Sequence, residues 1–339
     1  MGNKLLLLLY LLIPCSCVSV STLDIQVLEP AAEPLTPYVD RPALVSRINS
    51  DLKGDSGKNL PDVPGLHRDA ALEALYSLAH ILNESPGMDY IDSSLVMIEL
   101  QDAGPYSMKT PIDPAKIIEL CRRLDTDAVV ALEVFYIGYD STLVLKSGGQ
   151  SGWLSAYYHG NLNVAINALW RVYEGESGYQ ADEFFLTDTM VWEYSSFRKW
   201  QVEKYLPTFE KASLEAAYFT ALVYSRRIAP HWMEEERSYF FRGNLRIRRA
   251  ADHIRNNRLD QAEMILLELL NRRNTYTVAA ACYNLALINE LRGEYREALK
   301  LARLSYHYRM HPLTAGYIET LEERLGKSYE LDRQLGRED

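Results

Sequence analysis

Apolar and polar positions along the chain follow two different periods, and the change falls near residue 207. Before it, short runs that are β-branched or almost continuously apolar alternate with segments whose apolar residues recur every three or four positions. These patterns are typical of strands covered on both faces and of amphipathic helices. From about residue 208 the period is 3.6 and strand-like runs disappear. The pattern predicts a small mixed α/β sheet domain followed by an α-helical domain.

The predicted sheet begins with three buried strands, which are residues 42–48, 93–100 and 127–137. Two helical patterns lie between these strands. The second helix has Asp113 and Pro114 in the favoured order for an N-cap and a first helical residue. Strands that alternate with helices in this way imply parallel pairing through right-handed crossovers.

Two longer strand patterns follow, at 161–174 and 181–194, and the turn sequence GESGYQ lies between them. This arrangement is typical of an antiparallel hairpin, which would lie at the edge of the sheet. We therefore expect a mixed sheet covered by helices in residues 41–200.

The helical part contains an internal repeat, because residues 244–270 align with residues 280–306 at an offset of 36 residues. The second copy resembles a tetratricopeptide repeat, in which small residues let two helices approach and aromatic residues fill the gaps between turns. The residues expected to make this packing are Ala250, Ala262, Ala279, Tyr283, Ala286, Gly293, Tyr295, Ala298 and Ala302. Two repeats cannot bury their faces alone, so the helices at 209–228 and 314–335 are expected to flank or cap them. The predicted helical domain spans 208–337.

The first seventeen residues predict a lipoprotein signal peptide. The apolar run at 5–13 has nine residues and follows Lys4, which fits a signal sequence, whereas a membrane span needs about 20 apolar residues. Cys17 follows Ser16 and resembles the acylated cysteine of a bacterial lipoprotein, with Cys15 as the alternative site.

Ordinary secretion, with cleavage near residues 19–21, is the other interpretation of this leader. The segment 18–40 carries Pro30, Pro34 and Pro37 and is expected to form an extended tether, apart from a short strand near 23–28. An acylated N-terminus would hold the protein on a membrane by its lipid. The expected location is therefore the cell envelope. The outer membrane is the expected membrane, and the sequence does not indicate which of its faces carries the protein.

Charge is distributed unevenly, since residues 1–207 carry a net charge of −12 and residues 208–339 carry +2. An acidic first part argues against broad nucleic-acid binding, which needs a basic surface. Behind the leader only Cys121 and Cys282 remain, both in apolar helical surroundings, so no disulfide framework is expected.

Motifs for nucleotide binding, serine hydrolysis and zinc proteolysis are absent from the sequence. His307 and His311 have metal-ligand spacing, but a surface pair at a helix end explains them better. Asp125 and Asp127 could pair as catalytic carboxylates, although a turn between helix and strand also favours aspartate. We expect no enzymatic activity, no metal and no cofactor. A basic cluster of Arg242, Arg246, Arg248 and Arg249, near Arg226 and Arg227, is either a solvated face or a contact surface.

The chain as a whole resembles a Bacteroidota family of uncharacterised cell-envelope lipoproteins with tetratricopeptide-like repeats. The matching features are the leader with its cysteine, LDIQVLEPA (23–31), TDAVVALEVF (126–135), RIAPHW (227–232) with the following Arg237, and the repeat with YNLALINELRGEYREAL. The resemblance implies an anchored, non-enzymatic envelope protein.

The expected function is that of a lipid-anchored interaction or assembly module, whose helical repeats bind an unidentified envelope protein or peptide. The alternative is an envelope protein that binds a ligand or glycan through the α/β domain, using the polar loop 49–67 and the tyrosines grouped near the strands, which are Tyr136, Tyr139, Tyr157 and Tyr158. A hydrolase ranks third, because it would need a nucleophile or a carboxylate pair that converges in a pocket.

Overall fold

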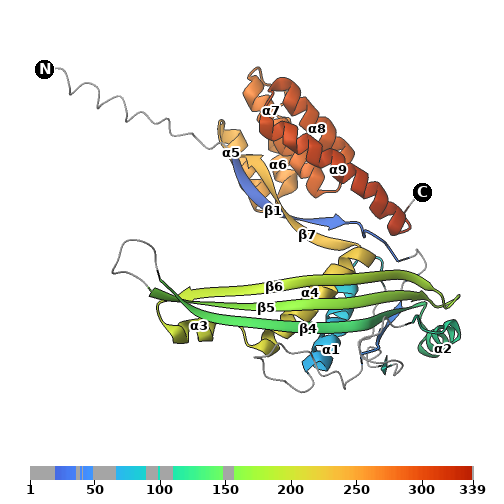
Figure 1. The fold of residues 1–339 in the computed structure, drawn as a ribbon. Coiled ribbons are helices and arrows are strands. Elements are labelled where there is room, and N and C mark those ends of the chain that lie inside the picture. The colour runs from blue at the N-terminus through green and yellow to red at the C-terminus, as the bar shows by residue number, and fades with distance from the viewer. Residues whose placement is uncertain are drawn as a thin grey trace. The chain divides into compact units, whose positions relative to one another are not determined.

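The computed structural model describes residues 20–35, 39, 41–48, 66–88, 98–99, 110–147 and 156–337. They form two compact units (Figure 1). The α/β unit comprises described residues within 30–231 and 333–337, and the helical unit comprises 20–29 and 232–332. The predicted order, a mixed α/β sheet region followed by a helical region, is confirmed.

The N-terminal leader lies outside the described residues, and with it Cys15 and Cys17. So do residues 49–65 of the predicted loop and residues 93–97 of the second predicted strand. Among the helices that are described, none combines the length and the apolar character needed to cross a membrane.

The α/β unit is built on a five-stranded sheet with the order β3-β2-β4-β5-β6. The strands are β2 (Pro42–Ser46), β3 (Ile98–Glu99), β4 (Ala128–Ser147), β5 (Ala156–Glu174) and β6 (Gln180–Ser196). β2 pairs in parallel with both β3 and β4, and β4, β5 and β6 pair antiparallel. The parallel pairing and the hairpin predicted from the sequence are confirmed. β4 continues ten residues past its predicted end at 137, so β4, β5 and β6 form a long three-stranded ribbon, called the ribbon below.

Helices cover both faces of this sheet. They are α1 (Leu66–Asn83), α2 (Pro114–Leu124), α3 (Lys199–Tyr205) and α4 (Phe209–Ile228). α1 and α4 pack on the face that presents Val130 and Leu132, and α2 packs on the opposite face with Val129 and Ala131, as the alternation of side chains along a strand requires. The predicted cap of α2 is confirmed, since the Asp113 side chain accepts the N–H of Ala115 at 2.8 Å.

Helix α4 belongs to the α/β unit, which corrects the prediction that residues 209–228 flank the helical repeats. Its small buried residues, among them Ala216 and Ala221, join the core formed by α1 and the sheet. Tyr224 of α4 stacks on Trp170 of β5 with ring centroids 4.9 Å apart. The change from one unit to the other therefore falls at residues 231–232 and not at 207–208, because this alanine-rich face fits the sheet.

The helical unit consists of α5 (Leu245–Arg255), α6 (Leu259–Leu267), α7 (Thr275–Leu291), α8 (Tyr295–Tyr308) and α9 (Pro312–Gln334). α5 packs against α6 and α7 packs against α8, so the first four helices form two successive hairpins. Tyr317 and Leu321 of α9 complete the same apolar core. Cys282 of α7 is buried and unbonded, like Cys121 of α2.

A two-stranded sheet also belongs to the helical unit, and the sequence pattern does not predict it. β1 (Val20–Glu29) pairs with β7 (His231–Phe240). β1 contains the short strand expected near 23–28 but is longer. β7 lies in a region expected to be wholly helical. The inward side of β7 carries Glu235 and Arg237 beside Tyr239. Because two of these three inward residues are charged, the strand does not show the usual apolar alternation.

Candidate functional site

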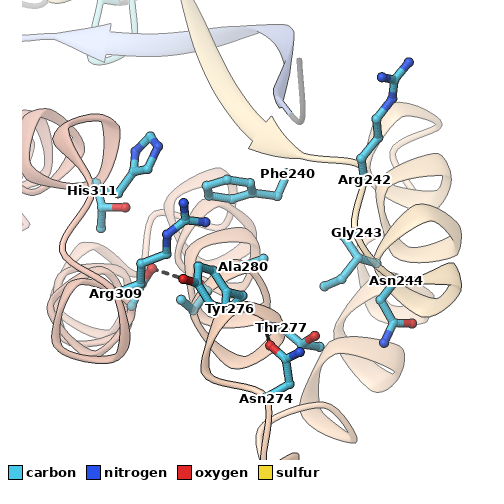
Figure 2. A pocket seen from close by; sticks show the side chains of 14 residues that line it. Phe240, Arg242, Gly243, Asn244, Asn274, Tyr276, Thr277, Ala280, Arg309 and His311 are labelled. Atoms are coloured by element: carbon cyan, nitrogen blue, oxygen red, sulfur yellow. Dashed lines mark hydrogen bonds between the residues drawn. The ribbon is translucent and has the colours of Figure 1, made fainter. Parts of the chain in front are cut away.

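A cavity of about 180 Å³ lies in the helical unit where several of its elements begin or end (Figure 2). The connection from β7 to α5, the start of α7, the end of α8 and the start of α9 contribute its walls. The labelled lining residues are Phe240, Arg242, Gly243, Asn244, Asn274, Tyr276, Thr277, Ala280, Arg309 and His311.

Two asparagine caps fix the helices that begin at this pocket. The Asn244 side chain accepts the N–H of Arg246 at 2.8 Å, and the Asn274 side chain accepts the N–H of Thr277 at 3.1 Å. Capping satisfies backbone donors that have no partner within the helix. It also sets where α5 and α7 begin. The caps therefore fix the positions of the neighbouring residues that line the cavity.

The pocket is basic. Arg309 and His311 line it, Arg242 stands at its edge, and none of the lining residues is acidic. Figure 2 shows the Arg309 guanidinium between the rings of His311 and Tyr276, whereas the Arg242 side chain extends away from them. Within the part of the chain that the structure describes, no ion pair engages Arg309; its guanidinium carbon lies 4.4 Å from the centroid of the Tyr276 ring. A cation–π contact of this kind holds the guanidinium in place without neutralising it.

His311 lines the pocket and carries one hydrogen-bond donor. Its Nδ1 accepts the N–H of Leu313 at 3.2 Å, so the proton of the neutral imidazole is on Nε2. The Phe240 ring lies edge-on to the His311 ring, with centroids 6.2 Å apart. The pocket thus combines an aromatic wall with two nitrogen donors, Arg309 and His311, which both belong to the connection between α8 and α9.

The base of the pocket is already hydrogen-bonded within the protein. The Ser305 hydroxyl donates to the Ala279 carbonyl at 2.8 Å, and Thr314 is buried. Ile247, Ala279 and Ala280 add apolar surface. A lining of cations, donors and aromatic rings without a carboxylate or thiol suits the binding of an anionic group that has an apolar neighbour.

The residues predicted to pack the repeats lie mostly inside the hairpins and not in this pocket. Ala250, Ala262, Ala279, Tyr283, Ala286, Ala298 and Ala302 are buried, Tyr295 is half-buried, and Gly293 adopts a left-handed backbone with φ of +79°. Only Ala279 of this set lines the cavity. The predicted residues therefore build the frame of the site.

Arg309, the central cation of the pocket, was not among the residues predicted to be functional. One signal was present: residues 305–313, around Arg309, include no acidic residue, so Arg309 has no acidic neighbour within four positions along the chain. His311 was considered as a metal ligand together with His307. No group of three metal-binding side chains occurs in the described ranges, and His311 instead faces the basic pocket.

The aspartates considered as a carboxylate pair serve the turn after α2. Asp125 ends the helix in a left-handed conformation, with φ of 54°, and forms an ion pair with Arg41 at 3.1 Å. Both carboxylate oxygens of Asp127 accept the backbone N–H of Arg41 at 3.1 Å. The structure supports the turn interpretation.

A buried polar cluster in the α/β unit is not evident from the sequence pattern. Glu133 is fully buried; it accepts a hydrogen bond from Arg47 at 2.6 Å and another from the Tyr173 hydroxyl at 2.7 Å. Arg171 lies 3.9 Å from the same carboxylate and binds Glu183 at 2.7 Å. Burial, reinforced by the hydrogen bond to Glu133, raises the pKa of Tyr173 to about 12. These contacts connect Arg47, which follows β2, to β4 and β5 within the sheet.

Comparison with known proteins gives two matches to family profiles. The profile described as Domain of unknown function (DUF8603) matches residues 44–240, and Domain of unknown function (DUF6340) matches residues 248–323. The first match includes α4, in agreement with the place of that helix in the α/β unit, and the second covers most of α5–α9. No curated protein matches the sequence. Because the first profile covers more than half of the 339 residues, the chain belongs to the family Domain of unknown function (DUF8603).

Proposed function

We propose that the protein is a lipid-anchored interaction module of the cell envelope, and that its helical unit binds an acidic group on a partner protein or peptide. The observation that carries this proposal is the cavity in which Arg309 and His311 converge without an acidic lining residue. In this proposal the protein is not an enzyme, needs no metal or cofactor, and does not bind nucleic acid. The anchor is an acyl chain on Cys17, with Cys15 as the alternative, at the outer membrane.

The helical hairpins support the proposed resemblance to tetratricopeptide repeats. α5–α6 and α7–α8 are consecutive pairs of packed helices, and the alanines that align at an offset of 36 residues are buried in both copies. Small buried residues of this kind let the two helices of each pair approach closely. Stacked hairpins present the ends and inner faces of successive helices to a binding partner.

The chemistry of the pocket defines what it would recognise. A carboxylate can accept hydrogen bonds from the Arg309 guanidinium and from His311 Nε2, and such charge-assisted bonds are stronger than neutral ones. A cavity of about 180 Å³ is smaller than the usual 300–1,000 Å³ of a small-molecule site. It therefore fits one acidic side chain or a chain terminus, and the rest of the partner would extend over the surrounding surface.

Binding of a glutamate-rich fluorescent peptide to the chain from residue 20 to residue 339, followed by anisotropy, tests the proposal. We expect Arg309→Gln to weaken binding at least fivefold. Arg296→Gln is the matched control, because Arg296 also lies over a tyrosine, Tyr329, with 5.4 Å to the ring centroid, and does not line the pocket. Equal affinities of the wild type and Arg309→Gln would contradict the proposal. If Arg309→Gln does weaken binding, co-purification from envelopes with the wild type, Arg309→Gln and Arg296→Gln would identify the natural partner.

The alternative, glycan or ligand binding by the α/β unit, has less support. Tyr157 and Tyr158 are consecutive residues of β5, and consecutive side chains point to opposite faces of a strand. The two rings therefore do not form one platform on which a sugar could stack. Retained glycan binding after Tyr157→Ala and Tyr158→Ala would remove this alternative.

A further inference from the structure

One end of the ribbon exposes several large apolar side chains. Phe197 is 71% exposed, Leu145 60%, Tyr205 58% and Trp200 52%. Single exposed apolar residues are ordinary, but a group of large ones marks an interaction surface. We call the surface formed by β4 residues 143–146 and residues 197–205 the ribbon tip.

Strand register brings these residues to the same end of the unit. Leu145 of β4 pairs with Tyr158 of β5, which pairs with Ser196 of β6, the residue before Phe197. Figure 1 shows α3 beside this end of the ribbon, where β4 ends. The ring centroids of Tyr205 and Tyr194 of β6 are 4.9 Å apart. This contact packs the end of α3 against the sheet.

Gly160 explains how α3 can lie so close to the strands. A Cβ at Gly160 would stand 2.4 Å from Val202 Cγ1 and 2.7 Å from Leu206 Cδ1, so only glycine leaves room for these side chains. With Val202 buried against β5, the exposed residues of α3, including Trp200, are held outward. The tip is therefore a defined surface of the fold.

Basic residues border the apolar group. They are Lys146, Arg198, Lys199 and Lys204, all exposed. The only acidic residue in 196–206 is Glu203, which pairs with Lys199 at 3.2 Å. This local excess of positive charge occurs in a part of the chain, residues 1–207, whose net charge is −12. The positive charge of the tip is therefore opposite in sign to the net charge of residues 1–207.

We propose that the ribbon tip docks on the surface of a membrane that contains anionic lipids. Tryptophan and tyrosine favour the boundary between headgroups and acyl chains, where an apolar ring and a polar atom are both accommodated. Lysine and arginine at the same level attract anionic headgroups, while Phe197 and Leu145 enter the outer acyl region. This contact is independent of an N-terminal acyl chain and of the basic pocket in the helical unit.

Co-sedimentation with vesicles tests the inference on the chain from residue 20 to residue 339, which carries no acyl chain. We expect binding to phosphatidylcholine vesicles with one-third phosphatidylglycerol, little binding to pure phosphatidylcholine, and release by high salt. A double variant, Phe197→Ala with Trp200→Ala, should lower the partition coefficient at least tenfold. Lys146→Gln with Lys204→Gln should lower it in the anionic vesicles by about fivefold per charge.

The matched control is Phe185→Ala, because Phe185 is 59% exposed on β6 but lies outside the tip; it should bind vesicles like the wild type. Circular dichroism and thermal melts of each variant establish that the fold is retained. Absence of vesicle binding by the wild type, or equal binding by the wild type and the Phe197/Trp200 variant, would overturn the inference. If the tip binds a protein and not a membrane, the wild type should not bind vesicles.

Discussion

Asn284 of α7 hydrogen-bonds both backbone groups of Phe240, the last residue of β7. Its Oδ1 accepts the Phe240 N–H at 2.8 Å, and its Nδ2 donates to the Phe240 carbonyl at 2.7 Å. The side chain thus acts as a neighbouring strand would, at a place where the sheet has ended. Because Phe240 lines the basic pocket, this contact also positions one wall of the site.

Asn284→Ala should lower the free energy of unfolding by about 2–6 kcal/mol. The substitution leaves two buried backbone groups without partners, at roughly 1–3 kcal/mol each. Urea unfolding followed by circular dichroism measures the change. Asn271→Ala, at an exposed position between α6 and α7, is the control and should stay within about 0.5 kcal/mol of the wild type. A similarly small change for Asn284→Ala would show that water replaces the asparagine.

The buried ion pair between Arg237 and Glu290 should show strong coupling. Arg237 Nε donates to Glu290 at 2.8 Å, and the Tyr317 hydroxyl donates to the same carboxylate at 2.6 Å. Arg237→Met removes the charge that compensates a buried carboxylate, and should cost about 3–5 kcal/mol. The double variant Arg237→Met with Glu290→Met should be less destabilised than the two single variants together. A double-mutant cycle by urea unfolding measures the coupling, and simple additivity would contradict it.

Alkaline pH should destabilise the α/β unit through Tyr173. Burial, together with the hydrogen bond to Glu133, raises the pKa of this hydroxyl to about 12, whereas an unfolded tyrosine titrates near pH 10. The protonated Tyr173 hydroxyl therefore contributes roughly 2–3 kcal/mol to the free energy of unfolding below pH 10. This contribution is lost as the pH rises toward 12.

The measurement is urea unfolding at several values between pH 8 and pH 11.5 for the wild type and Tyr173→Phe. The variant lacks a hydroxyl to ionise, so its stability should fall less steeply over this range, although it starts lower because Glu133 has lost a donor. Comparison with this variant separates Tyr173 from the other buried tyrosines whose pKa is raised, Tyr224, Tyr283 and Tyr317. Parallel curves for the two proteins would contradict the assignment.

Features with local causes could be predicted from the sequence. The start of α2 follows from the neighbouring residues Asp113 and Pro114, and the β5–β6 hairpin follows from its turn. Features that depend on distant partners could not. Nothing near β1 indicates that it pairs with β7, and nothing in α4 indicates which of two apolar cores it joins. The inward side of β7 carries Arg237, whose partner Glu290 lies on α7. The apolar and polar residues of β7 therefore do not alternate as in a buried strand.

The candidate site was only partly accessible to sequence reasoning for the same reason. The frame of alanines repeats with a period and could be predicted, whereas Phe240, Tyr276 and Arg309 come from three separate elements. None of them belongs to a motif with fixed spacing. Their convergence depends on the packing of the hairpins, which the sequence predicts in kind but not in detail.

The pairing of β1 with β7 has a consequence for biosynthesis. β1 emerges from the ribosome before the whole α/β unit, and its partner strand emerges after it. Domains generally fold as units during synthesis, so the α/β unit can fold first. Until β7 has been synthesised, β1 lacks the strand with which it pairs. Such a strand can pair wrongly with other chains. Substitutions that slow folding of the α/β unit should therefore reduce the yield of protein in cells even when the finished molecule is equally stable.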